Sequence, residues 1–384
     1  MRFFHLSDLH IGLKLINRDL GEDQTYILNQ IVEAAEREKP DAVVIAGDIY
    51  DKAIPSAEAV TIFDTFISSL TKAVPEAVIM MISGNHDSAP RVNVFRSILC
   101  DRKIYMIGNP PEKEEEYIEQ VVLPDCFGDV HFYLLPFVKP SMVKNIVGSD
   151  ENGNNCSYEE SIRRLLEREQ INTAGRNVLV SHQFYVPSGG NADHVERMDS
   201  EIRTVGNIDE VHADVLKAFD YAALGHIHKP MTLGNACYRY CGTPLACSVS
   251  EAGQEKGIVL VEMGEKGDVK TSVLPLIPKR EIRVIKGTLQ EVLEQACEDF
   301  VTVILTDKVD YNVLDMQDRL RHAFPNLLEI RRELSRQMNY ESNYEAEKEA
   351  DPMELCRLFL GELNEEEEDL LKQVINELME GGER

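Results

Sequence analysis

Five short polar motifs, each directly after a short apolar run, constrain what this 384-residue chain can fold into. In chain order they are Asp8-Leu-His10, Gly47-Asp48-Ile-Tyr-Asp51, Gly84-Asn85-His86-Asp87, Ser181-His182 and Gly225-His226-Ile-His228. The apolar runs have the length and composition of β-strands. Because ligands of open α/β sheets bind beyond the carboxyl ends of strands, motifs at five strand ends can converge on one cleft. Carboxylate, imidazole and amide groups together suit a pair of divalent cations around a phosphate ester.

The first 140 residues alternate strand and helix patterns. Residues 43–46 and 78–82 are continuous apolar runs, typical of strands that are covered on both faces. Between them, Ser56 is expected to cap a helix whose apolar residues recur at helical spacing. Later apolar runs alternate with turn-rich stretches. The chain is therefore predicted to have an α/β fold, a two-layer β-sandwich flanked by helices, with a small α/β capping domain and a C-terminal helical tail.

Three units are expected along the chain. The segment Pro275-Leu-Ile-Pro278 marks a boundary, which gives a main domain over residues 1–275. Residues 276–337 show the pattern strand, helix, strand, helix, strand, including a helix predicted at 288–296. Residues 338–384 form an acidic tail with helix starts expected at Asp351-Pro352 and at Asn364. The last helix is predicted to carry an apolar stripe made of Leu371, Val374, Ile375 and Leu378.

The charge of the chain argues against nucleic-acid binding through bulk electrostatics. The net charge is −27 and the pI is near 4.8. Residues 341–384 alone carry 15 acidic against 4 basic side chains. A DNA substrate would then need local basic loops or a basic partner. The N-terminus begins with a strand pattern, and no run of eighteen apolar residues occurs, so a cytoplasmic protein without a membrane span is expected.

Taken together and in order, the motifs resemble the calcineurin-like metallophosphoesterase superfamily. Within it, the chain is similar over nearly its whole length to nuclease subunits of bacterial double-strand-break complexes. The resemblance is carried by the opening residues 1–12, by Gly84–Arg91 and Tyr221–Pro230, and by the stretch 240–245 that leads to Ser250-Glu251. The family more often has serine where this chain has Cys241 and Thr243, but neither position belongs to the ligand set.

The resemblance implies a role for each motif residue. One metal is assigned to Asp8, His10 and His228, and the other to Asn85, His182 and His226, with Asp48 bridging them. His86 is expected to face the phosphate as a proton donor or transition-state stabiliser, and Asp51 is expected to orient it. The cofactors implied are two divalent cations, and the resemblance selects Mn²⁺.

The function that the resemblance implies is a Mn-dependent DNA nuclease, a double-strand exonuclease and single-strand or hairpin endonuclease. It would act with an SbcC-like ATPase bound through residues 338–384, in a heterotetramer with two nuclease subunits. A phosphatase or a small-nucleotide phosphodiesterase of the same superfamily remains the alternative. Phosphoprotein phosphatases typically have Arg-Gly where this chain has Lys52-Ala53, and Glu where it has Asp87. A non-catalytic adaptor is a third interpretation, although such a chain should have lost ligands and every position is filled here.

Overall fold

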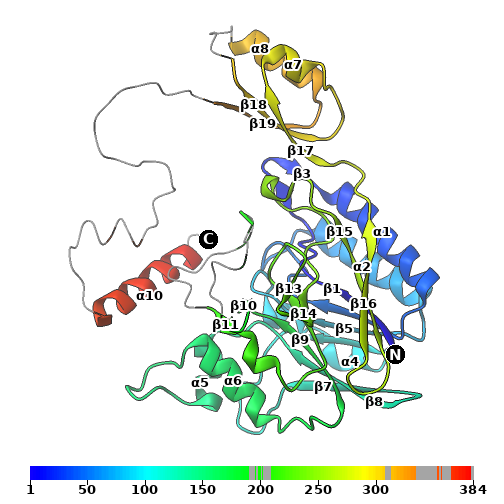
Figure 1. Cartoon of the computed structure of the whole chain (residues 1–384), viewed down its shortest axis with the longest axis vertical. Coiled ribbons are helices and arrows are strands. Elements are labelled where there is room, and N and C mark those ends of the chain that lie inside the picture. Colours follow the sequence, from blue (N-terminus) through cyan, green and yellow to red (C-terminus); the bar gives the residue numbers. More distant parts are fainter. Residues whose placement is uncertain are drawn as a thin grey trace.

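The computed structural model describes residues 1–189, 209–307, 313–333 and 365–381, with isolated positions 195, 198, 199, 201, 353 and 356. Two six-stranded sheets face each other and form the main body (Figure 1). This is the predicted two-layer arrangement. Among the described residues, no helix combines the length and the apolar composition that crossing a membrane requires.

The first sheet has the strand order β16-β15-β1-β4-β5-β6. Strands β1, β4, β5 and β6 are parallel, and β15 and β16 run antiparallel to their neighbours. Helices α1 and α2 cover its outer face. The Ser56 hydroxyl accepts a hydrogen bond from Ala59 N at 3.2 Å, so this predicted helix cap is confirmed. The bounds are β1 Arg2–Leu6, β4 Ala42–Ala46, β5 Val78–Ile82, β6 Ile104–Ile107, β15 Lys256–Met263, β16 Val269–Leu276, α1 Gly21–Glu38 and α2 Ala57–Ala73.

The second sheet has the order β13-β14-β12-β9-β8-β7, and its central strands β8, β9, β12 and β14 are parallel. Helices α5 and α6 pack on its outer face. The inner faces of the two sheets share a core in which the rings of Phe3 and Phe132 meet edge to face at 5.3 Å. The bounds are β7 Glu119–Asp125, β8 Gly128–Leu135, β9 Arg176–His182, β12 Tyr221–Gly225, β13 Met231–Leu233, β14 Asn235–Tyr240, α5 Pro140–Val147 and α6 Tyr158–Arg168.

Short elements surround the ends of these sheets. A small hairpin, β2 and β3, follows β1, and two short helices, α3 and α4, follow β5. A two-stranded pair, β10 and β11, and two 3₁₀ turns, η3 and η4, lie in the second half of the body. The bounds are β2 Lys14–Leu15, β3 Arg18–Asp19, α3 Ala89–Val92, α4 Arg96–Cys100, β10 Tyr185–Val186, β11 Val211–His212, η3 Ala213–Leu216 and η4 Val249–Glu251.

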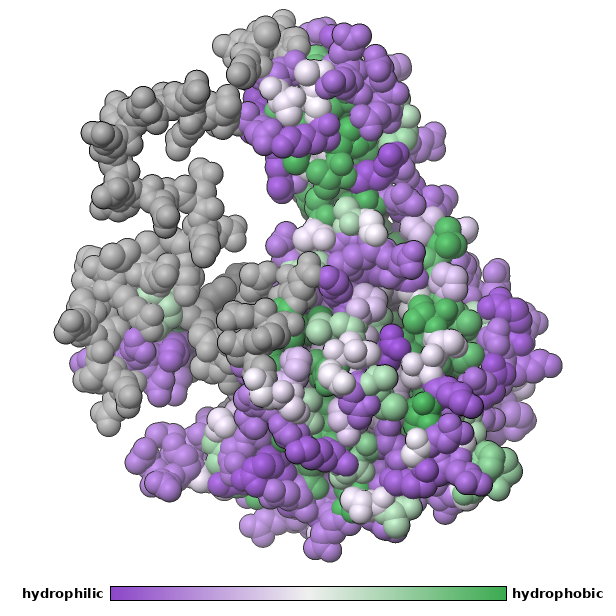
Figure 2. Space-filling model, in the orientation of Figure 1, coloured by the Kyte–Doolittle hydropathy of each residue, from purple (hydrophilic) through white to green (hydrophobic). Residues whose placement is uncertain are grey.

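A separate three-stranded parallel sheet, β17-β18-β19, forms a small unit with its own core. Helix α7 has a complete capping box between Thr288 and Glu291, but it ends at Leu293, earlier than the predicted residue 296. The unit docks on the body through an apolar cluster that includes Leu15 and Phe300, and on the face shown in Figure 2 hydrophobic residues gather near this junction. The bounds are β17 Ile282–Gly287, α7 Leu289–Leu293, β18 Phe300–Leu305, α8 Val313–Ala323 and β19 Leu327–Arg332.

The last helix, α10, spans Glu365–Gly381 and stands beside the body in Figure 1. Ile375 is buried against Met353, and Leu371 packs beside them. Val374, which belongs to the predicted stripe, is 44% exposed. The predicted helix starts at Asp351 and Asn364, and the side chain of Leu378, lie outside the described residues.

Candidate metal centre

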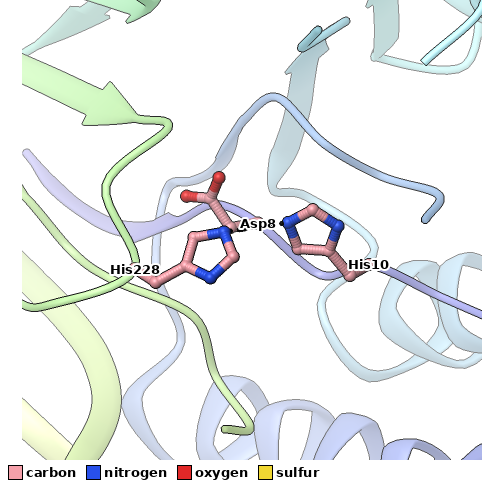
Figure 3. Close-up of side chains that lie close together, drawn as sticks. All are labelled: Asp8, His10 and His228. Carbon is pink, nitrogen blue, oxygen red and sulfur yellow. Dashed lines mark hydrogen bonds between the residues drawn. The ribbon is translucent and has the colours of Figure 1, made fainter. Parts of the chain in front are cut away.

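The carboxyl ends of β1, β4, β5, β9 and β12 meet in one place, and all the residues predicted as metal ligands lie there. The six carboxylate and imidazole side chains among them are almost completely buried, each at most 6% exposed. Asn85 and His86 are half-buried. Figure 3 shows three members of the cluster close together, with one ring nitrogen of His10 facing one of His228. The predicted ligands are Asp8, His10, Asp48, Asn85, His182, His226 and His228.

The first group contains Asp8, His10 and His228, whose potential ligand atoms lie within 4.8 Å of one another (Figure 3). The Nε2 atoms of the two imidazoles are 3.1 Å apart. His228 Nδ1 faces the carboxylate of Glu251 at 3.2 Å and therefore donates to it, so in the neutral ring Nε2 carries a lone pair. A lone pair directed at a second imidazole and a nearby carboxylate fits a bound cation.

The second group is built around the amide oxygen of Asn85. Its Oδ1 lies 3.0 Å from His182 Nε2 and 2.9 Å from His226 Nδ1. His182 Nδ1 donates to the carbonyl oxygen of Ala46 at 2.8 Å, which leaves Nε2 as an acceptor in the neutral ring. An imidazole lone pair and an amide oxygen then face each other without a hydrogen between them. This donor set also fits a cation.

Asp48 lies between the two groups. Its Oδ2 is 3.3 Å from His182 Nε2 and 3.7 Å from His10 Nε2. Its Oδ1 accepts a hydrogen bond from His86 N at 2.9 Å, which fixes the carboxylate. One carboxylate therefore contacts an imidazole of each group, the position that a bridging ligand requires.

The backbone of the motifs is bent into the left-handed region to make this approach. The φ angles are +53° at Asp8, +43° at His10, +50° at Asp48 and +101° at His226. Non-glycine residues rarely adopt such angles, and the strain persists only where surrounding contacts hold it. Asp8 N donates to Gly47 O at 2.9 Å and His10 N to Asp48 O at 3.1 Å, so the first two loops restrain each other.

His86 stands at the edge of the cluster. Its ring meets that of His10 edge to face at 4.8 Å, and its Nδ1 donates to the backbone carbonyl of Asp51 at 2.9 Å. The carboxylate of Asp51 lies 3.8 Å from His10 Nδ1. The hydrogen bond that His86 donates to Asp51 is thus accepted by the main chain.

Burial and neighbouring charges shift the pKa values of several residues in the cluster. Burial lowers the pKa of His182, but the carboxylates of Asp48 and Asp8 and the hydrogen bond to Ala46 together raise it to about 9. Burial raises the pKa of Asp8 and lowers that of His10. Because a metal ligand must be deprotonated, a cation and a proton compete for His182 near neutral pH.

Two acidic residues within the stretches that carry the family resemblance support the site, although motif spacing alone gives them no role. Asp87 accepts hydrogen bonds from Ile49 N, Tyr50 N and Gly84 N at 2.9 to 3.0 Å, and so ties the loop after β4 to the loop after β5. Burial and the nearby Asp48 raise the pKa of Asp87 to about 6. Glu251 contacts His228, as described above.

Gln24 in α1 is a third supporting residue. Its amide donates to His10 O at 2.6 Å and accepts from Gly12 N at 3.0 Å, so it holds the loop that carries His10. No pattern in the sequence distinguishes it from other polar residues of that helix.

Two family models and a named nuclease subunit match long stretches of the chain. A family model described as "Calcineurin-like phosphoesterase" matches residues 1–230, and one described as "Type 5 capsule protein repressor C-terminal domain" matches residues 278–364. The chain is 29% identical over 337 residues to the SbcD component of the nuclease SbcCD from Staphylococcus epidermidis, across 86% of this chain and 85% of that protein.

Solved structures that resemble this one include a dimetal phosphatase from Danio rerio, with a TM-score of 0.39 and 14% identity over 73% of this chain and 99% of that one. GAP50, described as the anchor in the inner membrane complex of Plasmodium, gives a TM-score of 0.41 and 12% identity over 85% and 96%. The predicted fold class and the predicted metal-dependent phosphoesterase class are confirmed by the first family model together with the cluster of candidate ligands. The chain belongs to the calcineurin-like phosphoesterase family.

Proposed function

We propose that this protein is a two-metal DNA nuclease, the catalytic subunit of an SbcCD-type complex in the cytoplasm that processes DNA breaks. One observation carries the proposal: two groups of buried acceptors face each other across Asp48, in a chain similar over 86% of its length to a nuclease subunit. Phosphodiester cleavage is the reaction for which such a pair of cation sites is suited.

Each ligand residue has a proposed place in the reaction. Asp8, His10 and His228 hold one cation, Asn85, His182 and His226 hold the other, and Asp48 holds both. Two cations held there would neutralise the charge of the phosphodiester and activate water for attack. The mixed nitrogen and oxygen donors favour Mn²⁺, Fe²⁺ or Zn²⁺ over Mg²⁺, and we propose Mn²⁺ as the native pair.

His86 is proposed as the group that protonates or stabilises the departing sugar oxygen. Its half-buried ring lies at the edge of the cluster, and Nδ1 donates a hydrogen bond to the Asp51 carbonyl. Nε2 is then the ring atom available to the substrate. Asp51 contributes by fixing the orientation of that ring through its main chain.

We propose that the small unit, residues 276–337, is a capping domain that contacts DNA, and that residues 338–384 bind an SbcC-like ATPase. With a net charge of −27, the chain needs local basic loops or a basic partner to hold a polyanion, and the ATPase would be such a partner. In α10, Leu370 and Val374 are 62% and 44% exposed on a strongly acidic helix. An apolar strip with charged flanks suits docking into a groove of a partner.

A second copy of this chain is the proposed occupant of another apolar surface. Val94, Phe95 and Ile98 are 49%, 68% and 63% exposed on consecutive turns that follow the His86 loop. Pairing of this surface with its own copy would bring two centres into one assembly and would give the heterotetramer with two nuclease subunits.

The proposed function is tested with His86→Ala and with a matched control, His131→Ala, which removes an imidazole in the middle of β8. With Mn²⁺, the first variant should lose about 10²- to 10⁴-fold in cleavage of linear duplex DNA and of a small aromatic phosphodiester, the typical worth of general acid–base assistance. Its metal content should stay at the wild-type level, and the control should keep both activities.

Three results would redirect the proposal. A loss of metal in His86→Ala would make that residue a ligand. Hydrolysis of small nucleotides without cleavage of DNA, even with the ATPase present, would favour the small-nucleotide phosphodiesterase. A wild-type protein that binds the ATPase but hydrolyses no phosphodiester would be an adaptor. The partner-binding role of the tail has its own test. A chain ending at residue 337 should keep activity on the small phosphodiester and should no longer bind the ATPase subunit.

A further inference from the structure

Glu251 is buried directly behind the first group of metal ligands. It ends the turn η4 and is 1% exposed. Its Oε1 accepts from His228 Nδ1 and from Ser248 Oγ, both at 3.2 Å. Its Oε2 accepts from Thr243 Oγ1 at 3.0 Å and from Lys256 Nζ at 2.7 Å. Both oxygens are therefore fixed by two donors each.

Lys256 makes a buried carboxylate tolerable at this position. It is the first residue of β15 and is 7% exposed. Besides Glu251, its ammonium group donates to His228 O at 3.1 Å and to Gln254 Oε1 at 2.9 Å, which uses all three hydrogens. A buried charge is retained only when it is paired and hydrogen-bonded, and this pair meets both conditions.

The same network holds the main chain of His228. His228 N donates to Glu201 Oε1 at 2.8 Å, and His228 O accepts from Thr243 N at 3.2 Å as well as from Lys256. With the main chain held on both sides and Nδ1 held by Glu251, the ring has one orientation left. That orientation presents Nε2 to His10 Nε2 at 3.1 Å.

We propose that Glu251 is a positioning residue that raises the cation affinity of the subsite formed by Asp8, His10 and His228 and leaves the other subsite unaffected. A carboxylate acceptor fixes the tautomer with the lone pair on Nε2 and makes the imidazole a stronger donor to a cation. His182 in the other subsite donates its Nδ1 hydrogen to the neutral Ala46 carbonyl instead, so Glu251 does not set the tautomer of that ring. The inference rests on the metal roles proposed above.

The test uses the full-length variant Glu251→Gln, titrated with Mn²⁺ by calorimetry and by electron paramagnetic resonance. Loss of such a supporting carboxylate typically weakens metal affinity by about 10- to 100-fold. One of the two binding events should weaken by that factor and the other should keep its affinity. The signal of a coupled Mn²⁺ pair should then appear only at higher metal concentration, while the single-ion signal appears as in the wild type. Glu251→Asp should recover part of the affinity.

Asp220→Asn is the matched control, because it also removes a buried carboxylate that accepts from a lysine and a main-chain nitrogen, Lys266 Nζ and Asn177 N, both at 2.8 Å. Both variants should lose thermal stability, but only Glu251→Gln should lose metal affinity. If Glu251→Gln does not fold, Thr243→Val removes a single donor from Oε2 and should weaken the same subsite to a smaller extent.

Unchanged Mn²⁺ binding in folded Glu251→Gln, or equal weakening of both binding events, would overturn the positioning role. These outcomes are independent of DNA cleavage. A wild-type protein that binds two Mn²⁺ ions but does not cut DNA would contradict the proposed nuclease and leave the role of Glu251 intact.

Discussion

Gly84→Ala is expected to damage the centre by displacing Asp48, without changing any ligand. Gly84 follows β5, and a Cβ atom there would lie 2.1 Å from Asp48 Oδ1 and 2.4 Å from Asp48 N. One contact is with the carboxylate and the other with the main chain. A change of side-chain rotamer alone therefore cannot relieve the overlap.

The size of this overlap determines how much activity and stability Gly84→Ala should lose. Real Cβ contacts essentially never fall below 3.0 Å, so Asp48 must move by roughly 1 Å. A misplacement of that size can cost about 10²-fold in rate. Overpacking of a tight site costs about 1–3 kcal/mol of stability. Gly84→Ala should thus fold, melt a few degrees lower, and hydrolyse a small aromatic phosphodiester with Mn²⁺ about 10²-fold more slowly than the wild type.

The control is Gly175→Ala, where the nearest atom to the added Cβ is Asn172 O at 3.3 Å and no ligand is near. It should keep wild-type activity. Steady-state rates at saturating Mn²⁺, together with metal content, separate lost binding from misplaced ligands. Activity of Gly84→Ala within about threefold of the wild type would refute the reasoning, because Asp48 would then tolerate the shift.

Two further predictions concern pH. Because the pKa of His182 is raised to about 9 in the metal-free protein, binding of Mn²⁺ at pH 7 should release a proton from this residue. Calorimetry in buffers of different ionisation enthalpy measures this release, and equal heats of binding in all buffers would contradict the prediction. Hydrogen bonds from Arg176 hold the pKa of Asp125 well below its ordinary value, so the ion pair stabilises the fold above about pH 4 and this contribution is lost as the pH falls further. Asp125→Asn should therefore lower the free energy of unfolding by about 3 kcal/mol at pH 7 and by less at pH 3, and a difference in melting temperature that does not shrink with pH would refute it.

The elements that position the centre could be predicted from the sequence because a motif at a strand end indicates both a secondary-structure element and the place of its ligand in the fold. An apolar run followed by Asp8 or Asp48 locates a strand, its end and a ligand together. Parallel strands then bring those ends to one edge of each sheet. The helix capped by Ser56 was predictable for a similar reason, since the cap and the apolar spacing agree.

The contacts behind the ligands could not be predicted in the same way. Glu251 and Lys256 reach His228 through the packing of a turn and a strand that lie more than twenty positions away in the chain. Gln24 holds the His10 loop from a helix whose sequence pattern shows only its apolar face. Asp51 meets His86 through its carbonyl group, and motif spacing carries no information about main-chain orientation. Each of these depends on tertiary geometry.

The left-handed backbone at Asp8, His10, Asp48 and His226 lowers the free energy of unfolding of the protein. Residues in this conformation typically cost about 1–3 kcal/mol each, and glycine or asparagine would relieve much of that cost. Selection for thermal stability would therefore favour some replacements of the ligands, and a requirement for catalysis opposes them. In a lineage that no longer needs the reaction, these positions should be among the first to drift, and glycine or asparagine there would be the trace of a lost activity.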